Sequence, residues 1–91
     1  MFKTLEELIS IIRQRKGFPS EKSYTSKLLS NQKLSIEKVK EEVAELIEAI
    51  EKNSNKVHEA SDVLYHLFVL LEANDIKIED VMDELKKRQK K

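Results

Sequence analysis

Apolar residues recur at helical spacing along most of the chain, in segments separated by short polar breaks. A first helix is expected from "TLEEL" onward, where Thr4 and Glu7 fit a capping box. Gly17 and Pro19 end that pattern, because both residues punctuate helices. The stretch "SYTSKLLS" then predicts two helical turns capped by Ser23, and "NQK" predicts a loop.

The middle of the chain predicts two longer helices separated by the triplet "NSN". Ser35 is expected to cap the first, which ends near Lys52. Its apolar stripe consists of Ile36, Val39, Val43, Leu46, Ile47 and Ile50. We therefore expect this stripe to form the side of the helix that packs into the core.

The second of these helices, from Lys56 to Glu72, is the most apolar segment. Its run "VLYHLFVLL" carries no charge when the histidine is neutral. A helix that is apolar on all sides is buried all round. In a chain of 91 residues such burial needs a partner subunit, since small domains often gain core by oligomerising. A final amphipathic helix is predicted over "IEDVMDELKKR".

Composition favours a single all-α domain over residues 1–91 that forms a dimeric helix bundle, because glycine and proline each occur once and 37% of residues are charged. Seventeen basic and seventeen acidic side chains cancel, so we expect no nucleic-acid or membrane-surface partner. No apolar run approaches the roughly 20 residues of a membrane span, and the N-terminus lacks a signal-peptide core. Together with the absence of cysteine, this indicates a cytoplasmic protein.

Five glutamates lie within "KVKEEVAELIEAIE", Lys38 to Glu51. Because successive helical residues turn by about 100°, Glu41, Glu45 and Glu48 point away from the apolar stripe. Glu42 lies at the flank of the stripe. Alone, this is the pattern of an ordinary solvated helix face.

The next helix changes that interpretation. Its opening, "HEASDVLYH", places Glu59, Asp62 and His66 at positions i, i+3 and i+7, on a face about 60° wide. Asp62 directly precedes the uncharged run, where an unpaired carboxylate costs on the order of several kcal/mol. It therefore needs a lysine, an arginine or a cation as its partner.

Two antiparallel helices would bring the acids of both segments together, and like charges so close raise one another's pKa values. A divalent cation removes that repulsion, and all-oxygen ligands favour Mg²⁺, with Mn²⁺ as the alternative. Magnesium commonly shares its ligands with substrate phosphates, which suggests cleavage of a phosphoanhydride.

Other motifs give weaker signals. "HEASD" resembles the zinc motif H-E-x-x-H but has aspartate in place of the second histidine, which argues against a zinc protease. His66 is either a satisfied core histidine or a metal ligand. The basic stretch "RQRK", Arg13 to Lys16, lies beside a loop and could reach a phosphate.

Taken together, these residues resemble the phosphoribosyl-ATP pyrophosphohydrolase family of histidine biosynthesis, among the all-α nucleotide pyrophosphohydrolases. The shared signature E-E-x-x-E followed by E-x-x-D reads here "EEVAE" at 41–45 and "EASD" at 59–62. "SYTSKLL" is similar to the family's S-Y-T-x-K/R-L element, and "ASDVLYHLFVLL" to its A-D-L-L-Y-H-L-L-V-L-L helix. Lys22 and Lys40 stand where the family commonly has glycine.

The resemblance implies hydrolysis of phosphoribosyl-ATP to phosphoribosyl-AMP and pyrophosphate, dependence on Mg²⁺, and a homodimer. It implies a metal site formed by Glu41, Glu42, Glu45, Glu59 and Asp62. Either Glu41 or Glu42 would act as general base instead of ligand. The expected substrate-binding residues are Arg15, Ser23, Tyr24, Thr25, Lys27 and Lys38.

Two alternatives stay open at this point. The first is a relative that removes pyrophosphate from ordinary or damaged nucleoside triphosphates; it would share the acidic signature but lack the S-Y-T and Y-H elements together. The second belongs to a different class, a non-catalytic helical dimerisation module whose glutamates are merely solvated.

Overall fold

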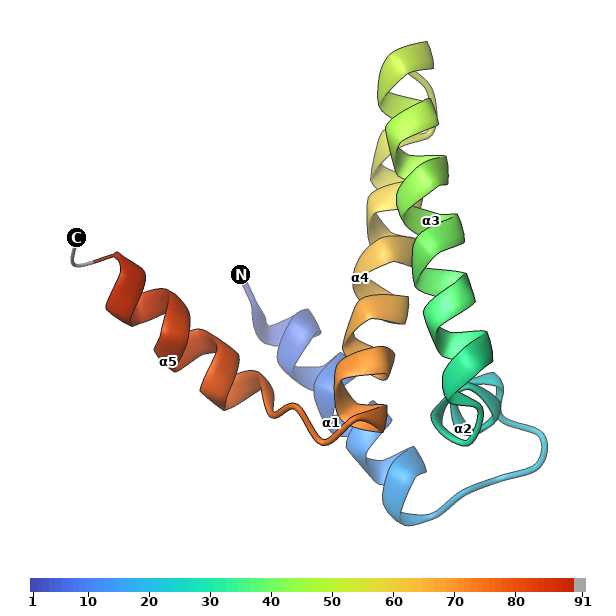
Figure 1. Cartoon of the computed structure of the whole chain (residues 1–91), viewed down its shortest axis with the longest axis vertical. Helices are drawn as coiled ribbons and strands as arrows, with labels where there is room; N and C mark the ends of the chain where they lie inside the picture. Colours follow the sequence, from blue (N-terminus) through green and yellow to red (C-terminus); the bar gives the residue numbers. More distant parts are fainter. Residues whose placement is uncertain (90–91) are drawn as a thin grey trace.

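The computed structural model describes residues 1–89, and its helices are connected by short loops (Figure 1). In chain order they are α1 (Lys3–Gly17), α2 (Tyr24–Leu29), α3 (Gln32–Lys52), α4 (Lys56–Ala73) and α5 (Ile78–Arg88). Residues 1–89 contain no β-strand, which confirms the predicted all-α class. None of the helices among these residues is long and apolar enough to cross a membrane.

Helices α3 and α4 form an antiparallel hairpin (Figure 1). Its turn contains Asn53 and Asn55, with φ of 52° and 55°, in the left-handed region that asparagine tolerates better than most residues. The backbone N–H of Ser54 donates to Ala49 O at 3.0 Å, which satisfies a carbonyl at the end of α3. The predicted "NSN" break is therefore the turn that sets α3 against α4.

Helix starts were harder to predict than helix ends. The Thr4–Glu7 capping box is wrong, because α1 begins at Lys3 and no side chain caps its N-terminus. The "NQK" loop and the Ser35 cap are also wrong: α3 begins at Gln32, and the Asn31 side chain accepts from Leu34 N at 3.1 Å. Because the cap lies earlier in the chain, α3 is one turn longer than predicted. Ser35 is therefore in the first turns of the helix, where its side chain is buried.

The hydrophobic core lies where α1 and α2 pack on the C-terminal half of α4. It consists of Ile12 from α1, Leu28 from α2, and Phe68 and Val69 from α4, each with at most 8% of its surface exposed. Ser23 caps α2 as predicted, since its Oγ accepts from Ser26 N at 3.2 Å. The core and this cap together hold α2, with its "SYT" residues, against α4.

The face that α3 buries differs from the predicted apolar stripe. Its buried residues are Ser35, Glu42 and Ala49, one every second turn, whereas Ile47 and Ile50 are more than half exposed. In the single chain the uncharged run of α4 is not covered on all sides, since Leu64 is 47% exposed; its complete burial was predicted only with a partner subunit. A single chain offers α3 few packing partners besides α4, so its apolar stripe is left uncovered. The predicted partner subunit stays a prediction.

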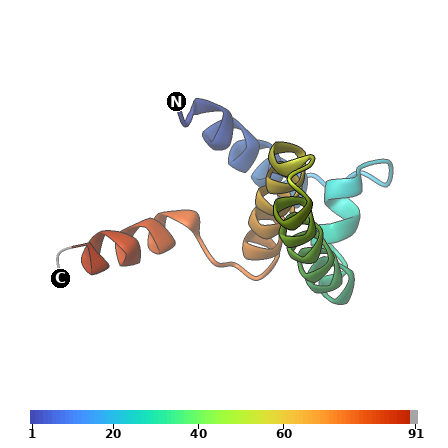
Figure 2. The ribbon, with the colours of Figure 1, turned by 90° about the horizontal axis from the view of Figure 1, so that it is seen from above.

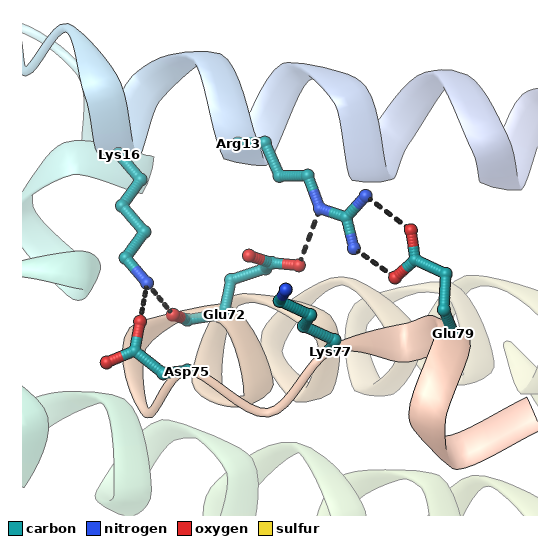
Figure 3. A pocket seen from close by; sticks show the side chains of 6 residues that line it. All are labelled: Arg13, Lys16, Glu72, Asp75, Lys77 and Glu79. Atoms are coloured by element: carbon teal, nitrogen blue, oxygen red, sulfur yellow. Dashed lines mark hydrogen bonds and ion pairs between the residues drawn. The ribbon is translucent and has the colours of Figure 1, made fainter.

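An ion-pair cluster joins α1 to the loop between α4 and α5 and to the first turn of α5 (Figure 3). Arg13 donates from Nε to Glu72 at 2.8 Å and from both terminal nitrogens to Glu79 at 2.9 and 2.6 Å. Lys16 donates to the carbonyl of Glu72 at 2.6 Å and pairs with Asp75. The cluster holds the first turn of α5 against α1, and α5 then projects away from the α3–α4 hairpin (Figures 1 and 2).

Candidate metal centre

The acidic residues of α3 and α4 meet across the hairpin. Glu45 of α3 and Glu59 of α4 line the same cavity, and Glu45 raises the pKa of both Glu42 and Glu59. Asp62 is close enough to raise the pKa of both Glu42 and Glu59. Glu41, Glu42 and Glu45 also offer carboxylate oxygens that all lie within 4.8 Å of one another. Glu59 and Asp62 belong to a second such group on α4, which adjoins the first. We refer to the five carboxylates of the two adjoining groups, Glu41, Glu42, Glu45, Glu59 and Asp62, as the acidic cluster.

Glu42 is the most deeply placed member of the acidic cluster. Its surface is only 7% exposed, and its Oε2 has no hydrogen-bond partner among residues 1–89. Burial raises the pKa of Glu42, and the neighbouring Glu45 raises it further. Glu59 is similar to Glu42, because its Oε2 is buried and has no hydrogen-bond partner within residues 1–89. Burial is the main cause that raises the pKa of Glu59, and Glu45 is the second.

The donor set of the cluster fits a hard divalent cation. All its donors are carboxylate oxygens, the ligands that Mg²⁺ and Mn²⁺ prefer. A buried carboxylate without a partner costs free energy, and a bound cation would supply the missing partner for Glu42 and Glu59. Thus the residues present match the ion that the sequence indicated.

Glu41 forms an ion pair with Lys38, which lies on the same helix. Lys38 Nζ lies 3.2 Å from Glu41 Oε2, and this hydrogen bond is the main reason that the pKa of Lys38 is raised. The charge of Lys38 also acts on the Tyr24 hydroxyl, opposing the increase in the pKa of Tyr24 that burial causes. Lys38 therefore lies between the acidic cluster and α2, as a phosphate-binding residue would need to.

A hydrogen-bonded aromatic group connects α2 to α4 beside the cluster. Tyr24 OH lies 3.1 Å from His66 Nε2, and His66 Nδ1 lies 2.8 Å from the carbonyl of Asp62. Because a carbonyl only accepts, Nδ1 carries a hydrogen. In the tautomer with its single hydrogen on Nδ1, Nε2 accepts the hydrogen of the Tyr24 hydroxyl. The second link joins Thr25 Oγ1 and Tyr65 OH. His66 therefore contacts Asp62 through its backbone carbonyl.

The other predicted substrate-binding residues lie at varying positions around α2. Ser23 uses its Oγ to cap the helix, Lys27 is exposed on it, and Arg15 is half-buried in the last turn of α1. Neither Arg15 nor Lys27 pairs with the acidic cluster within residues 1–89. Two of the basic residues of "RQRK", Arg13 and Lys16, instead bind carboxylates of the ion-pair cluster.

Sequence reasoning also missed a residue at the edge of the acidic cluster. His58 Nε2 lies 3.4 Å from Asp62 Oδ2. The signal was present in "HEASD", since residues four apart share a helix face.

A family model described as "Phosphoribosyl-ATP pyrophosphohydrolase" matches residues 5–89. The chain belongs to this family. Among similar proteins, the histidine biosynthesis bifunctional protein HisIE of Pyrococcus furiosus is 47% identical over 94% of this chain and 41% of its own length. The phosphoribosyl-ATP pyrophosphatase of Methanococcoides burtonii is 43% identical over 92% of this chain and 90% of its own. That of Methanoculleus marisnigri is 42% identical over 94% of both chains.

Membership in the phosphoribosyl-ATP pyrophosphohydrolase family makes the chain an enzyme of the hydrolase class. The chain spans less than half of the bifunctional relative but most of the two single-function ones. Residues 5–89 include both signature motifs and the "SYT" and "YH" elements.

Proposed function

We propose that this protein hydrolyses phosphoribosyl-ATP to phosphoribosyl-AMP and pyrophosphate in histidine biosynthesis, with a divalent cation held by the acidic cluster. The names of the relatives support the substrate and the pathway. The observation that carries the metal is Glu42, a carboxylate with 7% exposure and an Oε2 that has no partner within residues 1–89. Magnesium is the first choice of ion, with Mn²⁺ as its substitute.

The residues divide into ligands and a base by their surroundings. Glu42, Glu45, Glu59 and Asp62 would hold the cation, which when bound neutralises phosphate oxygens and lowers the pKa of water. Glu41 is exposed and lies beside Lys38, so solvent reaches its carboxylate. We assign Glu41 as the general base that takes the proton of the water attacking the α-phosphorus.

Substrate contacts would come from the side of the cluster that faces α2. Lys38 is the best-placed cation for a phosphate, since it already contacts the cluster at Glu41. Arg15 and Lys27 are further candidates from α1 and α2. The Tyr24 hydroxyl donates its hydrogen to His66, so its oxygen would accept from a sugar hydroxyl or an amino group of the substrate.

The deciding experiment is turnover of phosphoribosyl-ATP with and without Mg²⁺, next to a panel of deoxynucleoside triphosphates. The expected result is Mg²⁺-dependent release of pyrophosphate from phosphoribosyl-ATP and little from the panel. Preference for a deoxynucleoside triphosphate would overturn the assignment of phosphoribosyl-ATP as the substrate. Failure of the wild type to bind Mg²⁺ or Mn²⁺, with or without a substrate analogue, overturns the metal site.

We also propose that the enzyme works as a homodimer. The exposed apolar residues Val43, Ile47 and Ile50 form one stripe on α3, and Leu64 is a further exposed apolar residue on α4. A contiguous apolar surface of this kind is typical of an interface. Sedimentation of the wild type and of Ile47→Glu tests this: we expect a dimer and a monomer respectively, and a monomeric wild type at micromolar concentration contradicts it.

A further inference from the structure

His58 is a potential metal ligand that the proposed mechanism does not use. It lies one helical turn before Asp62 on α4, with Nε2 3.4 Å from Asp62 Oδ2. The ligand atoms of His58, Glu59 and Asp62 all lie within 4.8 Å of one another. The imidazole thus adds a nitrogen donor to two members of a cluster whose other donors are all oxygens.

The spacing of His58 and Asp62 suits a shared ion. At 3.4 Å, the contact is longer than an ordinary hydrogen bond of about 2.7–3.2 Å. Two ligands that are each about 2.1 Å from one ion, at an angle of about 90–110°, lie roughly 3.0–3.4 Å apart. The pair is therefore placed as two neighbouring ligands of a cation would be.

The second observation comes from the buried side of the same cluster. Glu42 is 7% exposed, and its Oε2 lacks a hydrogen-bond partner in the described part of the chain. Its neighbour Glu45 lines one cavity together with Glu59 of α4. The Glu59 Oε2 atom is also buried and unpaired within residues 1–89. Glu59 shares its group of ligand atoms with His58 and Asp62, so a cation held by these three residues would lie beside this unpaired carboxylate.

We propose that His58 Nε2 binds the cation at the outer edge of the acidic cluster, and that this chain therefore binds borderline divalent ions such as Co²⁺ and Mn²⁺ more tightly than Mg²⁺. Imidazole nitrogen adds affinity for transition metals, whereas Mg²⁺ prefers oxygen ligands. This inference rests on the metal site of the proposed function and not on the identity of its substrate. It makes the metal preference of the enzyme a property of one exposed residue.

Metal binding without nucleotide tests this proposal. Calorimetric titrations with Mg²⁺, Mn²⁺ and Co²⁺ would compare the wild type with His58→Gln, His58→Leu and the control Ser61→Ala. His58 and Ser61 are both exposed, so none of these changes opens the core. We expect both His58 variants to bind Co²⁺ at least about tenfold more weakly than the wild type, because even the loss of a residue that only orients a metal ligand costs about that much. Their loss of Mg²⁺ affinity should be smaller. The control should match the wild type.

Pulsed electron paramagnetic resonance of bound Mn²⁺ identifies the nitrogen directly. The expected result is a ¹⁴N coupling in the wild type that disappears in His58→Leu. A coupling that persists in that variant assigns the nitrogen elsewhere, to His66 for example, and overturns the inference. Metal binding without any ¹⁴N coupling also overturns it and leaves the proposed function standing. Absence of metal binding by the wild type overturns the proposed site itself, a separately recognisable outcome.

Discussion

Two groups of carboxylates lie at opposite ends of α4, and they differ in what surrounds them. At the C-terminal end, Glu72, Asp75 and Glu79 each contact Arg13 or Lys16 (Figure 3). At the N-terminal end, the acidic cluster gathers five carboxylates, and the only lysine or arginine that pairs with it within residues 1–89 is Lys38. Within residues 1–89 the ion-pair cluster has a basic partner for each acid, whereas the acidic cluster has one such partner for five acids, as the proposed cation site requires.

The pKa values show the same contrast. Hydrogen bonds from Arg13 lower the pKa of Glu79 from 4.5 to about 2, and a hydrogen bond from Lys16 lowers that of Asp75. Burial raises the pKa of Glu42 and Glu59 instead. Acidic residues on one small fold are therefore pushed in opposite directions, and the direction separates a structural group from a candidate functional one.

The largest effect is expected from Glu42→Gln, which removes the buried charge and keeps the shape. Turnover of phosphoribosyl-ATP should fall by at least about a hundredfold, since a buried ligand is lost. Stability without metal should be unchanged or higher, because the amide is cheaper to bury than the unpaired carboxylate. Steady-state kinetics and urea unfolding measure the two quantities. Glu51→Gln, at an exposed position of α3, is the control; a Glu42→Gln enzyme with full activity contradicts the assignment.

The opposite response is expected in the ion-pair cluster. Arg13→Met keeps the apolar stem but leaves the Glu72 side chain, only 10% exposed, without its guanidinium. Because Arg13 itself is 38% exposed, we expect a loss of roughly 1–2 kcal/mol, below the 3–5 kcal/mol of a fully buried pair. Urea unfolding would measure it, and Mn²⁺ affinity should stay unchanged. Equal loss in both measurements would mean that the two clusters are not independent.

Acid should weaken the ion-pair cluster next. The folded pKa values of Glu79 and Asp75 are depressed, so their stabilisation is present above pH values near 4.5 and is lost as pH falls toward 2. Unfolding free energies measured across that range should decline with a slope that Glu79→Gln reduces. An unchanged slope in the variant would assign the acid sensitivity to other carboxylates.

The smallest effect is expected from Tyr24→Phe beside the acidic cluster. The change removes one hydrogen bond to His66, worth about 1 kcal/mol, while the ring keeps its place beside Tyr65. We expect a several-fold increase in KM with a smaller change in kcat, since a binding contact is lost and the metal ligands are kept. A change in kcat alone would instead place Tyr24 in the chemical step.

Helical periodicity predicted the elements well, but it could not choose between equivalent local signals. Asn31 and Ser35 are both good capping residues one turn apart, and the structure uses the first. The prediction that Ser23 caps α2 is confirmed. Local propensity alone therefore identifies candidate caps without always choosing the one that is used.

The acidic motifs were predicted to meet, and in the structure they do, but the depth of Glu42 was not predicted. The helical wheel predicts that the most apolar stripe, around Val43 and Ile50, is the buried face of α3. In the single chain that stripe is exposed. Small side chains at Ser35 and Ala49 favour the close approach of α4, so they select the buried face instead. The partners of Arg13 lie 59 and 66 residues away, a separation that no local pattern reveals.

Ser35, Glu42 and Ala49 recur every seven residues at the seam between α3 and α4, the repeat of a coiled coil. Leucine at the middle position would fill the seam and increase stability, so Glu42 is a point of local frustration, as expected of a residue kept for the proposed cation site rather than for packing. A copy of this gene freed from selection for catalysis should lose its acidic residue at the seam early. On the proposed assignment, position 42 would then be an evolutionary marker that separates working enzymes from relatives kept only for their fold.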